Sequence, residues 1–383
     1  MKRKVVNKKN LMIVHPDLRF GGAERQIVNL ISGIQKGNLC KPVLALYKIE
    51  GPLLEELSVD GELEIYDLKS YPFGTIGTFL RLVFLMKKLR IHVVYSFLVG
   101  PNLFCALAGR LLGIDFIVWG NRISSFKYGE FGLKGNIADY LARLLSRYVD
   151  LIISNTEVGV RELQKKGIKA KQNIVIGNGI YVPHLESNLE RRNIFRQELG
   201  ISLNAIVIGQ VARLVSWKGY SVFLQAAVEF VRINPVAKFV CVGDGATAYK
   251  MQLQSEGERL GIDKHIFWLG NRSDVSTILG AIDIFTLTST SGEGFSNALA
   301  EAMAAGLPVV VTDIGESRRI VGDCGIVVEP NNSKELVRAW QILVGDQVDR
   351  KTIGIRSRKR VSEHYSIESM VNQTAIAIGI KGG

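Results

Sequence analysis

The segment "DIFTLTSTSGEGFSNALAEAMAAGLPVVVTD", residues 283–313, decides the fold of this chain. An apolar run leads into a glycine-rich loop, a helical pattern begins after Ser296, and a second apolar run begins at Pro308. Ser296 is a favoured residue at a helix start, and Gly306 followed by Pro308 is typical of a helix end. The segment therefore predicts a strand, a loop, a helix and a second strand, which is the repeating unit of a parallel α/β sheet.

The same alternation extends over the whole chain. Apolar, β-branched runs alternate with helical patterns such as residues 23–34 and 77–89, and helical segments at 333–345, 350–362 and 367–378 follow the last run. The polar segment 181–192 separates two series and is predicted to be a linker. The expected strands are residues 11–15, 42–47, 64–68, 92–98, 115–120, 150–156 and 173–179, and then 205–213, 237–245, 265–270, 283–289, 308–313 and 325–330. We expect two Rossmann-like domains in tandem, facing a central cleft at the carboxyl ends of their strands.

Composition limits the class of protein. A chain of 383 residues with 47% hydrophobic and 22% charged residues is globular, and its four separated cysteines form no CxxC, which argues against a zinc site and fits reduced thiols. No signal-peptide pattern is visible. The uncharged run at 91–109 is long enough to span a bilayer, but Gly100 and Pro101 interrupt it, so we expect a buried strand, a turn and a helix.

The positive charge is uneven. Residues 1–180 hold 26 Lys and Arg against 15 Asp and Glu, whereas residues 181–383 hold 22 against 21. Such asymmetry indicates an anionic partner for the first half, and nucleic acid, anionic lipid and a phosphorylated acceptor are all candidates. A basic surface that only favours solubility is the plain alternative.

Three motifs combine turns with groups that suit anions. In "HPDLRFGGAERQIVNL" (15–30), Gly21 and Gly22 precede a helix whose first N–H groups are free, although the motif is not the GxGxxG dinucleotide fingerprint. In "GQVARLVSWKGYSVF" (209–223), Arg213 and Lys218 flank a strand-to-helix loop and suit a pyrophosphate. "VGDG" (242–245) is another glycine turn, in which Gly243 would line the same cleft. Each motif alone also fits a tight turn or solvated surface cations.

The loop of the opening segment adds carboxylates. Glu293 lies before the helix start and Glu301 lies about one turn inside the helix. Carboxylates suit sugar hydroxyls, and the backbone N–H groups at the helix start suit a phosphate.

Together these motifs resemble those of the retaining glycosyltransferases of family 4. The order "GGAE", "RLVSWKG", "VGDG" and then the E-x7-E segment "EGFSNALAE" matches over nearly the whole chain. The resemblance implies the GT-B fold and transfer of a sugar, with retention of configuration, from a nucleotide sugar to a saccharide acceptor of a bacterial surface polysaccharide. UDP is expected as the nucleotide from its frequency in the family, and GDP stays open. A GT-B nucleotide-sugar epimerase is the alternative enzyme.

The resemblance also assigns roles by position. Arg213 and Lys218 would hold the donor diphosphate, and Glu293 would bind hydroxyls of the donor sugar. Glu301 would bind the ribose, and Arg272 in "LGNRSDV" (269–275) would lie near the base. The other expected donor-binding residues are Gly294, Phe295, Ser296, Asn297, Gly243, Gly21 and Gly22. Because the sequence contains no D-x-D motif, we expect no metal ion and no cofactor.

One position departs from the family pattern. Many members carry a histidine after the fifth strand, whereas this chain has "VWGNRISS" there, with Asn121 and Arg122. We expect Arg122, and with it Asn121, near the sugar or the acceptor. His15 at the end of the first strand is a further candidate, although a plain turn histidine would look the same.

The expected domain plan assigns each part a task. Residues 1–182 would bind the acceptor, residues 183–365 the nucleotide sugar, and a helix within 366–383 would cross back to the first domain. The basic amphipathic segments 71–90 and 126–148 suit an anionic membrane surface, which predicts a lipid-linked acceptor and a peripheral location on the inner face of the cytoplasmic membrane. A non-catalytic sugar-nucleotide binder and a nucleic-acid-binding protein are the competing classes, but no RNA- or DNA-binding module is present.

Overall fold

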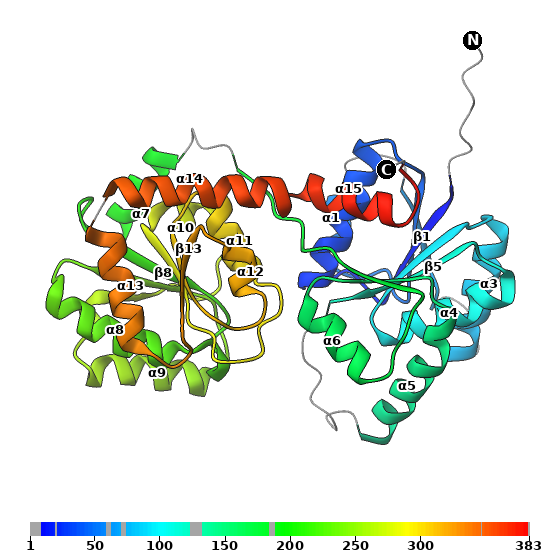
Figure 1. Cartoon of the computed structure of the whole chain (residues 1–383), viewed down its shortest axis with the longest axis horizontal. Coiled ribbons are helices and arrows are strands. Elements are labelled where there is room, and N and C mark those ends of the chain that lie inside the picture. The colour runs from blue at the N-terminus through cyan, green and yellow to red at the C-terminus, as the bar shows by residue number, and fades with distance from the viewer. Residues whose placement is uncertain are drawn as a thin grey trace, which may run out of the picture. The chain divides into compact units, whose positions relative to one another are not determined.

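The computed structural model describes residues 9–19, 21–58, 63–69, 74–122, 132–183, 188–345 and 347–381. The chain divides into two compact units (Figure 1). The first consists of Met1–Gly179 with Ile367–Gly383, and the second is Ile180–Ser366.

The first unit is built on a seven-stranded parallel sheet in the order β3-β2-β1-β4-β5-β6-β7. Its strands are β1 (Leu11–His15), β2 (Pro42–Leu46), β3 (Glu64–Asp67), β4 (Val93–Phe97), β5 (Phe116–Asn121), β6 (Leu151–Ser154) and β7 (Gln172–Val175). All seven apolar runs predicted for this half form strands. Both faces of a parallel sheet are covered by helices, so its strands read as almost unbroken apolar runs.

Alternate residues of each strand point to opposite faces of the first sheet. Leu11 and Ile13 pack with α1 (Gly22–Lys36), α2 (Leu54–Ser58) and α15 (Ile367–Ala377). Met12 and Val14 pack with the helices of the other face. Those helices are α3 (Gly74–Lys88), α4 (Val99–Leu112) and α5 (Gly132–Leu145), followed by α6 (Glu157–Lys165) (Figure 1).

The uncharged run at 91–109 contains β4 and most of α4, as predicted. Pro101 lies in the first turn of α4, where a helix loses no hydrogen bond to proline. Among the described residues, no helix is both long enough and apolar enough to cross a membrane.

The second unit has a six-stranded parallel sheet in the order β10-β9-β8-β11-β12-β13. Its strands are β8 (Val207–Val211), β9 (Lys238–Val242), β10 (Ile266–Trp268), β11 (Ile284–Leu287), β12 (Val309–Thr312) and β13 (Gly325–Val328). The six predicted runs of the second half are these strands. The helices are α7 (Asn188–Glu198), α8 (Tyr220–Ile233), α9 (Thr247–Arg259), α10 (Val275–Ala281), α11 (Asn297–Ala304), α12 (Ser317–Val321), α13 (Ser333–Gly345) and α14 (Gln347–His364).

The linker prediction for residues 181–192 was wrong from residue 188 onward, because α7 begins there; residues 184–187 lie outside the described residues. The polar sequence hides two buried anchors, Phe195 and Arg196. Arg196 donates to the carbonyl oxygens of Ala281 and Ala205 and to the carboxylate of Asp283. These contacts secure α7 to the sheet even though few of its residues are apolar.

Each sheet has one point at which the strand order reverses. In the first sheet it lies between β1 and β4, and in the second between β8 and β11. Loops leave these neighbouring strands in opposite directions, so a crevice opens at their carboxyl ends, where open α/β sheets bind ligands. Of the predicted site residues of the second unit, Arg213 and Lys218 follow β8, and Glu293 follows β11.

Candidate active site

The strand order brings Lys218 and Glu293 together in the second unit. Lys218 Nζ lies 2.5 Å from Glu293 Oε2, and Ser289 Oγ donates a 2.6 Å hydrogen bond to the same oxygen. The side chains of Lys218 and Glu293 are only 14% and 8% exposed. The cation and the carboxylate that the sequence predicts at separate positions therefore form one polar cluster.

The backbone behind Lys218 is held in place by the loop after β11. Gly219 has φ +67°, and a Cβ there would lie 1.9 Å from the carbonyl oxygen of Thr288. Gln210 Nε2 donates to the carbonyl oxygen of Lys218 at 3.1 Å, and the Thr290 N–H donates to that of Trp217 at 2.8 Å. These backbone contacts fix where the Lys218 side chain starts.

Arg213 is exposed, and its guanidinium has no hydrogen bond or ion pair with the described residues. Its loop is nevertheless well anchored, because Leu214 N–H donates to the carbonyl oxygen of Asp244 at 3.0 Å. Gly243 has φ +132°, and a Cβ there would lie 2.0 Å from the carbonyl oxygen of Ala212. Gly243 thus permits close packing of the "VGDG" turn against the loop that carries Arg213.

The start of α11 presents the predicted free N–H groups. Ser296 caps the helix through a 3.4 Å bond from the Leu299 N–H to Ser296 Oγ. Within the described part of the chain, the backbone N–H groups of Phe295 and Ser296 have no acceptor. Gly294 and Asn297 flank them, and Glu301 lies one turn inside the helix, as predicted.

Arg272 lies in the loop after β10 and is committed to a neighbour. Its Nε and Nη2 atoms donate to the two carboxylate oxygens of Asp274 at 2.8 and 2.7 Å. This fork holds the pKa of the Asp274 carboxyl below its usual value. The loop joins the preceding one through a 2.8 Å bond from the Gly243 N–H to the carbonyl oxygen of Gly270.

In the first unit, His15 ends β1, and Gly21 and Gly22 lead into α1. His15 is 1% exposed, and its Nδ1 lies 2.5 Å from the carbonyl oxygen of Asp17. Its Nε2 has no hydrogen bond and lies 3.8 Å from Glu24 Oε1. Burial lowers the pKa of His15, and this outweighs the nearby carboxylates.

The "WGNR" segment at the end of β5 has a structural explanation. A Cβ at Gly120 would lie 2.4 Å from the ring of Phe97, so only glycine fits under that ring. The Arg122 guanidinium carbon lies 5.8 Å from the centre of the Phe97 ring, and Nη1 donates to Asn178 Oδ1 at 2.8 Å. Asn121 Nδ2 donates to Ser154 Oγ at 3.2 Å.

Several buried polar atoms of the first unit have no hydrogen-bond partner among the described residues. They lie in or just after β1, β4, β5 and β6: His15 Nε2, Tyr95 Oη, Arg122 Nε and Asn155 Oδ1. Buried polar groups are normally bonded, so unpaired ones mark a place where a ligand or water is expected. The carboxyl edge of the first sheet is therefore a second candidate binding region.

Sequence reasoning missed several residues that contact the predicted site residues, namely Ser289, Phe97 and Asn178. Ser289 is the last residue of the predicted strand 283–289, at the carboxyl end where site residues are expected, so this position could have revealed it. The contacts of Phe97 and Asn178 with Arg122 join segments far apart in the chain, and no local pattern predicts them.

Comparison with known families agrees with this architecture. Residues 20–182 match the family described as Glycosyltransferase Family 4, and residues 191–360 match Glycosyl transferases group 1. The chain is a family 4-type glycosyltransferase.

Curated relatives of this glycosyltransferase extend over most of its length. The chain is 24% identical over 350 residues to an Escherichia coli protein named UDP-Gal:alpha-D-GlcNAc-diphosphoundecaprenol alpha-1,3-galactosyltransferase, covering 85% of this chain and 88% of the relative. It is 27% identical over 363 residues to a Campylobacter jejuni protein named N-acetylgalactosamine-N,N'-diacetylbacillosaminyl-diphospho-undecaprenol 4-alpha-N-acetylgalactosaminyltransferase, covering 90% and 92%.

Solved structures of other proteins have the same fold as this glycosyltransferase. Anabaena HepE, crystallised in complex with UDP, superposes with a TM-score of 0.83 at 21% identity, covering 97% of this chain and 99% of that one. The predicted GT-B architecture of two Rossmann-like units is confirmed.

Proposed function

We propose that this glycosyltransferase transfers a sugar from a UDP-sugar to a saccharide carried on a lipid diphosphate, in the assembly of a bacterial polysaccharide. The observation that carries the proposal is the polar cluster of Lys218, Glu293 and Ser289 at the carboxyl ends of β8 and β11. Arg213, in the same loop as Lys218, has no partner among the described residues. The printed names of two relatives, which act on sugars linked to diphosphoundecaprenol, support the acceptor class. A UDP-Gal donor in one of those names supports UDP, with GDP as the alternative nucleotide.

The donor would lie over the start of α11. Arg213 offers a planar fork that no other described residue occupies, and the N–H groups of Phe295 and Ser296 offer donors for a diphosphate oxygen. Glu293 would accept hydrogen bonds from the transferred sugar, and Glu301 would accept them from the ribose.

The same residues support a front-side reaction with retention. The bond between the anomeric carbon and the diphosphate oxygen breaks, and a bond to the acceptor hydroxyl oxygen forms on the same face. The hydroxyl proton passes to the departing phosphate oxygen. Glu293 Oε2 already accepts from Lys218 and Ser289, so this carboxylate suits positioning and charge stabilisation better than nucleophilic attack.

We further propose that the reaction needs no metal ion. Negative charge develops on the leaving diphosphate, and two cations and the start of α11 would stabilise it. Arg213 and Lys218 would do the work that a divalent cation held by a D-x-D motif does in other enzymes.

The first unit presents a surface suited to an anionic membrane. Helices α3, α4 and α5 pack side by side on one side of the sheet (Figure 1) and carry a single acidic residue, Asp139. Large apolar side chains are exposed along them and the adjoining turn: Ile76, Leu80, Phe84, Leu107, Leu111, Ile137, Tyr140, Leu141, Leu144 and Tyr148. We call this surface the α3–α4–α5 face.

Cations lie among these apolar residues. Arg81 and Lys88 lie 5.8 and 6.0 Å from the centre of the Phe84 ring, and Arg110 lies 5.4 Å from that of Tyr148. Exposed apolar side chains with interleaved cations match the interface of an anionic bilayer. We propose that this face holds the enzyme on the inner surface of the cytoplasmic membrane, where a lipid-linked acceptor is accessible. Residues 71–73 and 126–131 of the two segments predicted to bind membranes lie outside the described residues.

A transfer assay tests the proposal. The full chain is incubated with UDP- or GDP-sugars and a synthetic polyprenyl-diphosphate sugar, and the product is analysed by mass spectrometry and by NMR of the new linkage. We expect acceptor-dependent transfer from a UDP-sugar, the same anomeric configuration in donor and product, and equal rates with and without EDTA. Consumption of the donor without an acceptor would instead support an epimerase, and an inverted linkage would contradict retention.

Arg213→Ala separates binding from folding. Because the Arg213 side chain has no partner among the described residues, its loss should leave the melting temperature unchanged. The stabilisation of the protein by a UDP-sugar, which reflects binding to the native state, should fall sharply.

A further inference from the structure

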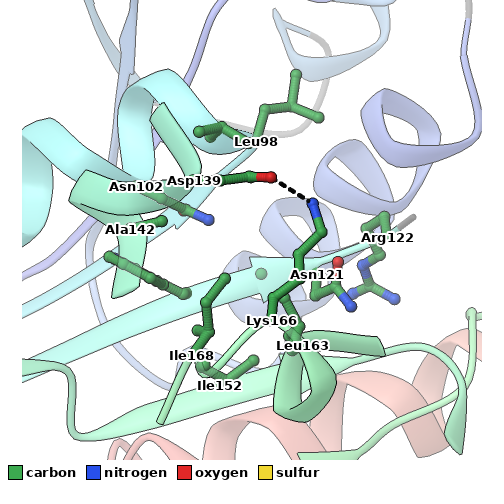
Figure 2. Close-up of a pocket in the computed structure, with 13 residues that line it drawn as sticks. Leu98, Asn102, Asn121, Arg122, Asp139, Ala142, Ile152, Leu163, Lys166 and Ile168 are labelled. Carbon is green, nitrogen blue, oxygen red and sulfur yellow. Dashed lines mark hydrogen bonds and ion pairs between the residues drawn. The ribbon is translucent and has the colours of Figure 1, made fainter. Parts of the chain in front are cut away.

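A small cavity in the first unit has no role in the chemistry described above. It lies between β5 and β6 and helices α4, α5 and α6, and has a volume of about 50 Å³ (Figure 2). Its walls are largely apolar and include the side chains of Leu98, Val99, Ala142, Ile152, Leu163 and Ile168.

Two asparagines place complementary polar groups in this lining. Ser96 Oγ donates to Asn102 Oδ1 at 2.8 Å, which orients the amide and leaves Asn102 Nδ2 as a donor without an acceptor among the described residues. Asn121 Nδ2 donates to Ser154 Oγ at 3.2 Å, which leaves Asn121 Oδ1 as an acceptor without a donor in the same part of the chain. The two asparagines thus offer one oriented donor and one oriented acceptor, and Trp119, also in the lining, has a further buried donor, Nε1, without a partner among the described residues.

One of the two cations in the lining is paired with a carboxylate. Figure 2 shows Lys166 reaching Asp139, and Lys166 Nζ lies 2.9 Å from Asp139 Oδ2. Lys166 is 7% exposed, whereas its partner Asp139 is 35% exposed, so only the lysine end of the pair is buried. Arg122, also in the lining, donates to the neutral Asn178 Oδ1, and its buried Nε has no partner among the described residues. The largely apolar walls suit a neutral, partly apolar ligand.

We propose that this cavity binds the acetamido group of an N-acetylated sugar substrate. The acetamido carbonyl oxygen would accept from Asn102 Nδ2, the acetamido N–H would donate to Asn121 Oδ1, and the methyl group would contact the apolar wall. At roughly 10–15 Å³ for each water-sized group, the cavity holds about four heavy atoms, the number in an acetamido group. A hydroxyl in that position would leave the apolar wall uncovered and one asparagine unpaired.

Direct binding tests this site without any turnover. The full chain is mixed with methyl N-acetylglucosaminide or methyl glucoside, and saturation-transfer NMR measures which ligand protons contact the protein. We expect the strongest transfer at the acetyl methyl group and little signal from the glucoside. Absent transfer to the acetyl methyl group, or equal signals from the two glycosides, would overturn the proposal.

Three variants test whether the signal comes from this cavity. Ala142→Leu fills the cavity and should abolish the acetyl-methyl signal, whereas Ala138→Leu, on the same helix but outside the lining, should retain it. Asn102→Asp keeps the shape and removes the donor, so it should weaken the signal even if Ala142→Leu folds poorly. An unchanged signal in Asn102→Asp and a folded Ala142→Leu would place the acetamido group elsewhere and overturn the site.

Transfer rates show whether the acetamido group belongs to the acceptor or to the donor sugar. This part of the inference rests on the proposed function. Two polyprenyl-diphosphate acceptors, carrying N-acetylglucosamine or glucose, are compared with one donor, and UDP-N-acetylglucosamine is compared with UDP-glucose on one acceptor. We expect a preference of about 10- to 100-fold in kcat/KM for the N-acetylated acceptor, lost in Ala142→Leu. A preference confined to the donors would assign the same cavity to the donor sugar. Transfer without any acetamido preference would overturn the inference and leave the glycosyltransferase proposal intact.

Discussion

Lys218 donates a 2.5 Å hydrogen bond to Glu293, although 75 positions separate the two residues in the sequence. They meet because β8 and β11 are neighbours at the reversal point of the second sheet, so the loops after both strands lie at one edge. Lys218, expected to bind the diphosphate, and Glu293, expected to bind the sugar, are therefore in direct contact with each other.

Because they share this contact, Lys218 and Glu293 should act as a unit in catalysis. We expect Glu293→Gln and Lys218→Met each to lower kcat by about 10²–10³-fold, and the double variant to lower it little further. Initial rates of sugar transfer at saturating donor and acceptor measure both effects. Lys359→Met, which breaks a surface ion pair on α14, is the control and should leave kcat unchanged. Full activity in Glu293→Gln would remove that residue from the mechanism.

The close approach of two loops at Gly219 predicts a large loss of stability on a small substitution. In Gly219→Ala the new Cβ would meet the Thr288 carbonyl oxygen at 1.9 Å, at a φ of +67° that disfavours L-residues. We expect a loss of about 3 kcal/mol or more in the free energy of unfolding. Denaturant titration of the full chain measures it.

Gly257→Ala provides a control of opposite sign. Gly257 lies inside α9, and a Cβ there would have nothing within 4 Å. Alanine has the higher helix propensity, so this substitution should stabilise the protein by about 0.5–1 kcal/mol. Equal stabilities for the two variants would show that the approach at Gly219 relaxes at little cost.

Membrane binding should depend on the cations of the α3–α4–α5 face. Replacing Arg81, Lys88 and Arg110 by glutamate should weaken co-sedimentation with phosphatidylglycerol vesicles by about 100-fold or more, at about 1 kcal/mol for each cation lost. Binding of the unchanged chain should fall as salt rises and be weak on phosphatidylcholine vesicles.

A second triple variant, with three charge reversals in the second unit, tests whether the loss of vesicle binding is specific to the α3–α4–α5 face. Lys334, Arg338 and Lys359 are exposed on α13 and α14, and their replacement by glutamate makes an equal change in net charge. We expect this variant to retain most of its vesicle binding. If both triple variants lose binding equally, net charge rather than the α3–α4–α5 face attracts the membrane.

His15 should make stability depend on pH near neutrality. Burial lowers its pKa in the folded protein, while the unfolded chain has a histidine pKa of about 6.5. As pH falls through about 6.5 toward the lower folded pKa, the unfolded state takes up a proton that the folded state does not, so stability is lost in that window. His15→Gln should lose less stability between pH 7.5 and pH 5 than the unchanged chain does. His364→Gln, at an exposed position, is the matched control; identical slopes in all three proteins would contradict the prediction.

The sequence predicts the strands well because buried parallel strands leave a direct trace in it. Each strand from Leu11 to Val328 coincides with a predicted run, although the edge strands β3 (EIYD) and β7 (QNIV) are only partly apolar. Ser296 and Gly306 delimit α11 through local backbone chemistry. The start of α7 was missed because its stability comes from tertiary anchors such as Arg196, which local periodicity does not reveal.

The sequence predicted which residues belong to the candidate site better than it predicted which of them contact one another. Glycines and cations after strands give a local signal, which led to Arg213, Lys218 and Gly243. The pairing of Lys218 with Glu293, and the packing of Phe97 over Gly120, depend on which strands are neighbours. Strand order is a property of the whole sheet, so no short segment contains it.

Residues 367–377 form α15, which packs against α1 in the first unit, and its Met370 and Val371 belong to the same apolar cluster as Leu11 and Ile13. Gly33 makes this contact close, since a Cβ there would lie 2.4 Å from the side chain of Val371. During synthesis, the first unit leaves the ribosome before the second. It therefore cannot complete its fold until residues 367–377, made after the whole of the second unit, have emerged. The second unit is continuous in sequence and can close as soon as it emerges, so the order in which the units mature is the reverse of the order in which they begin.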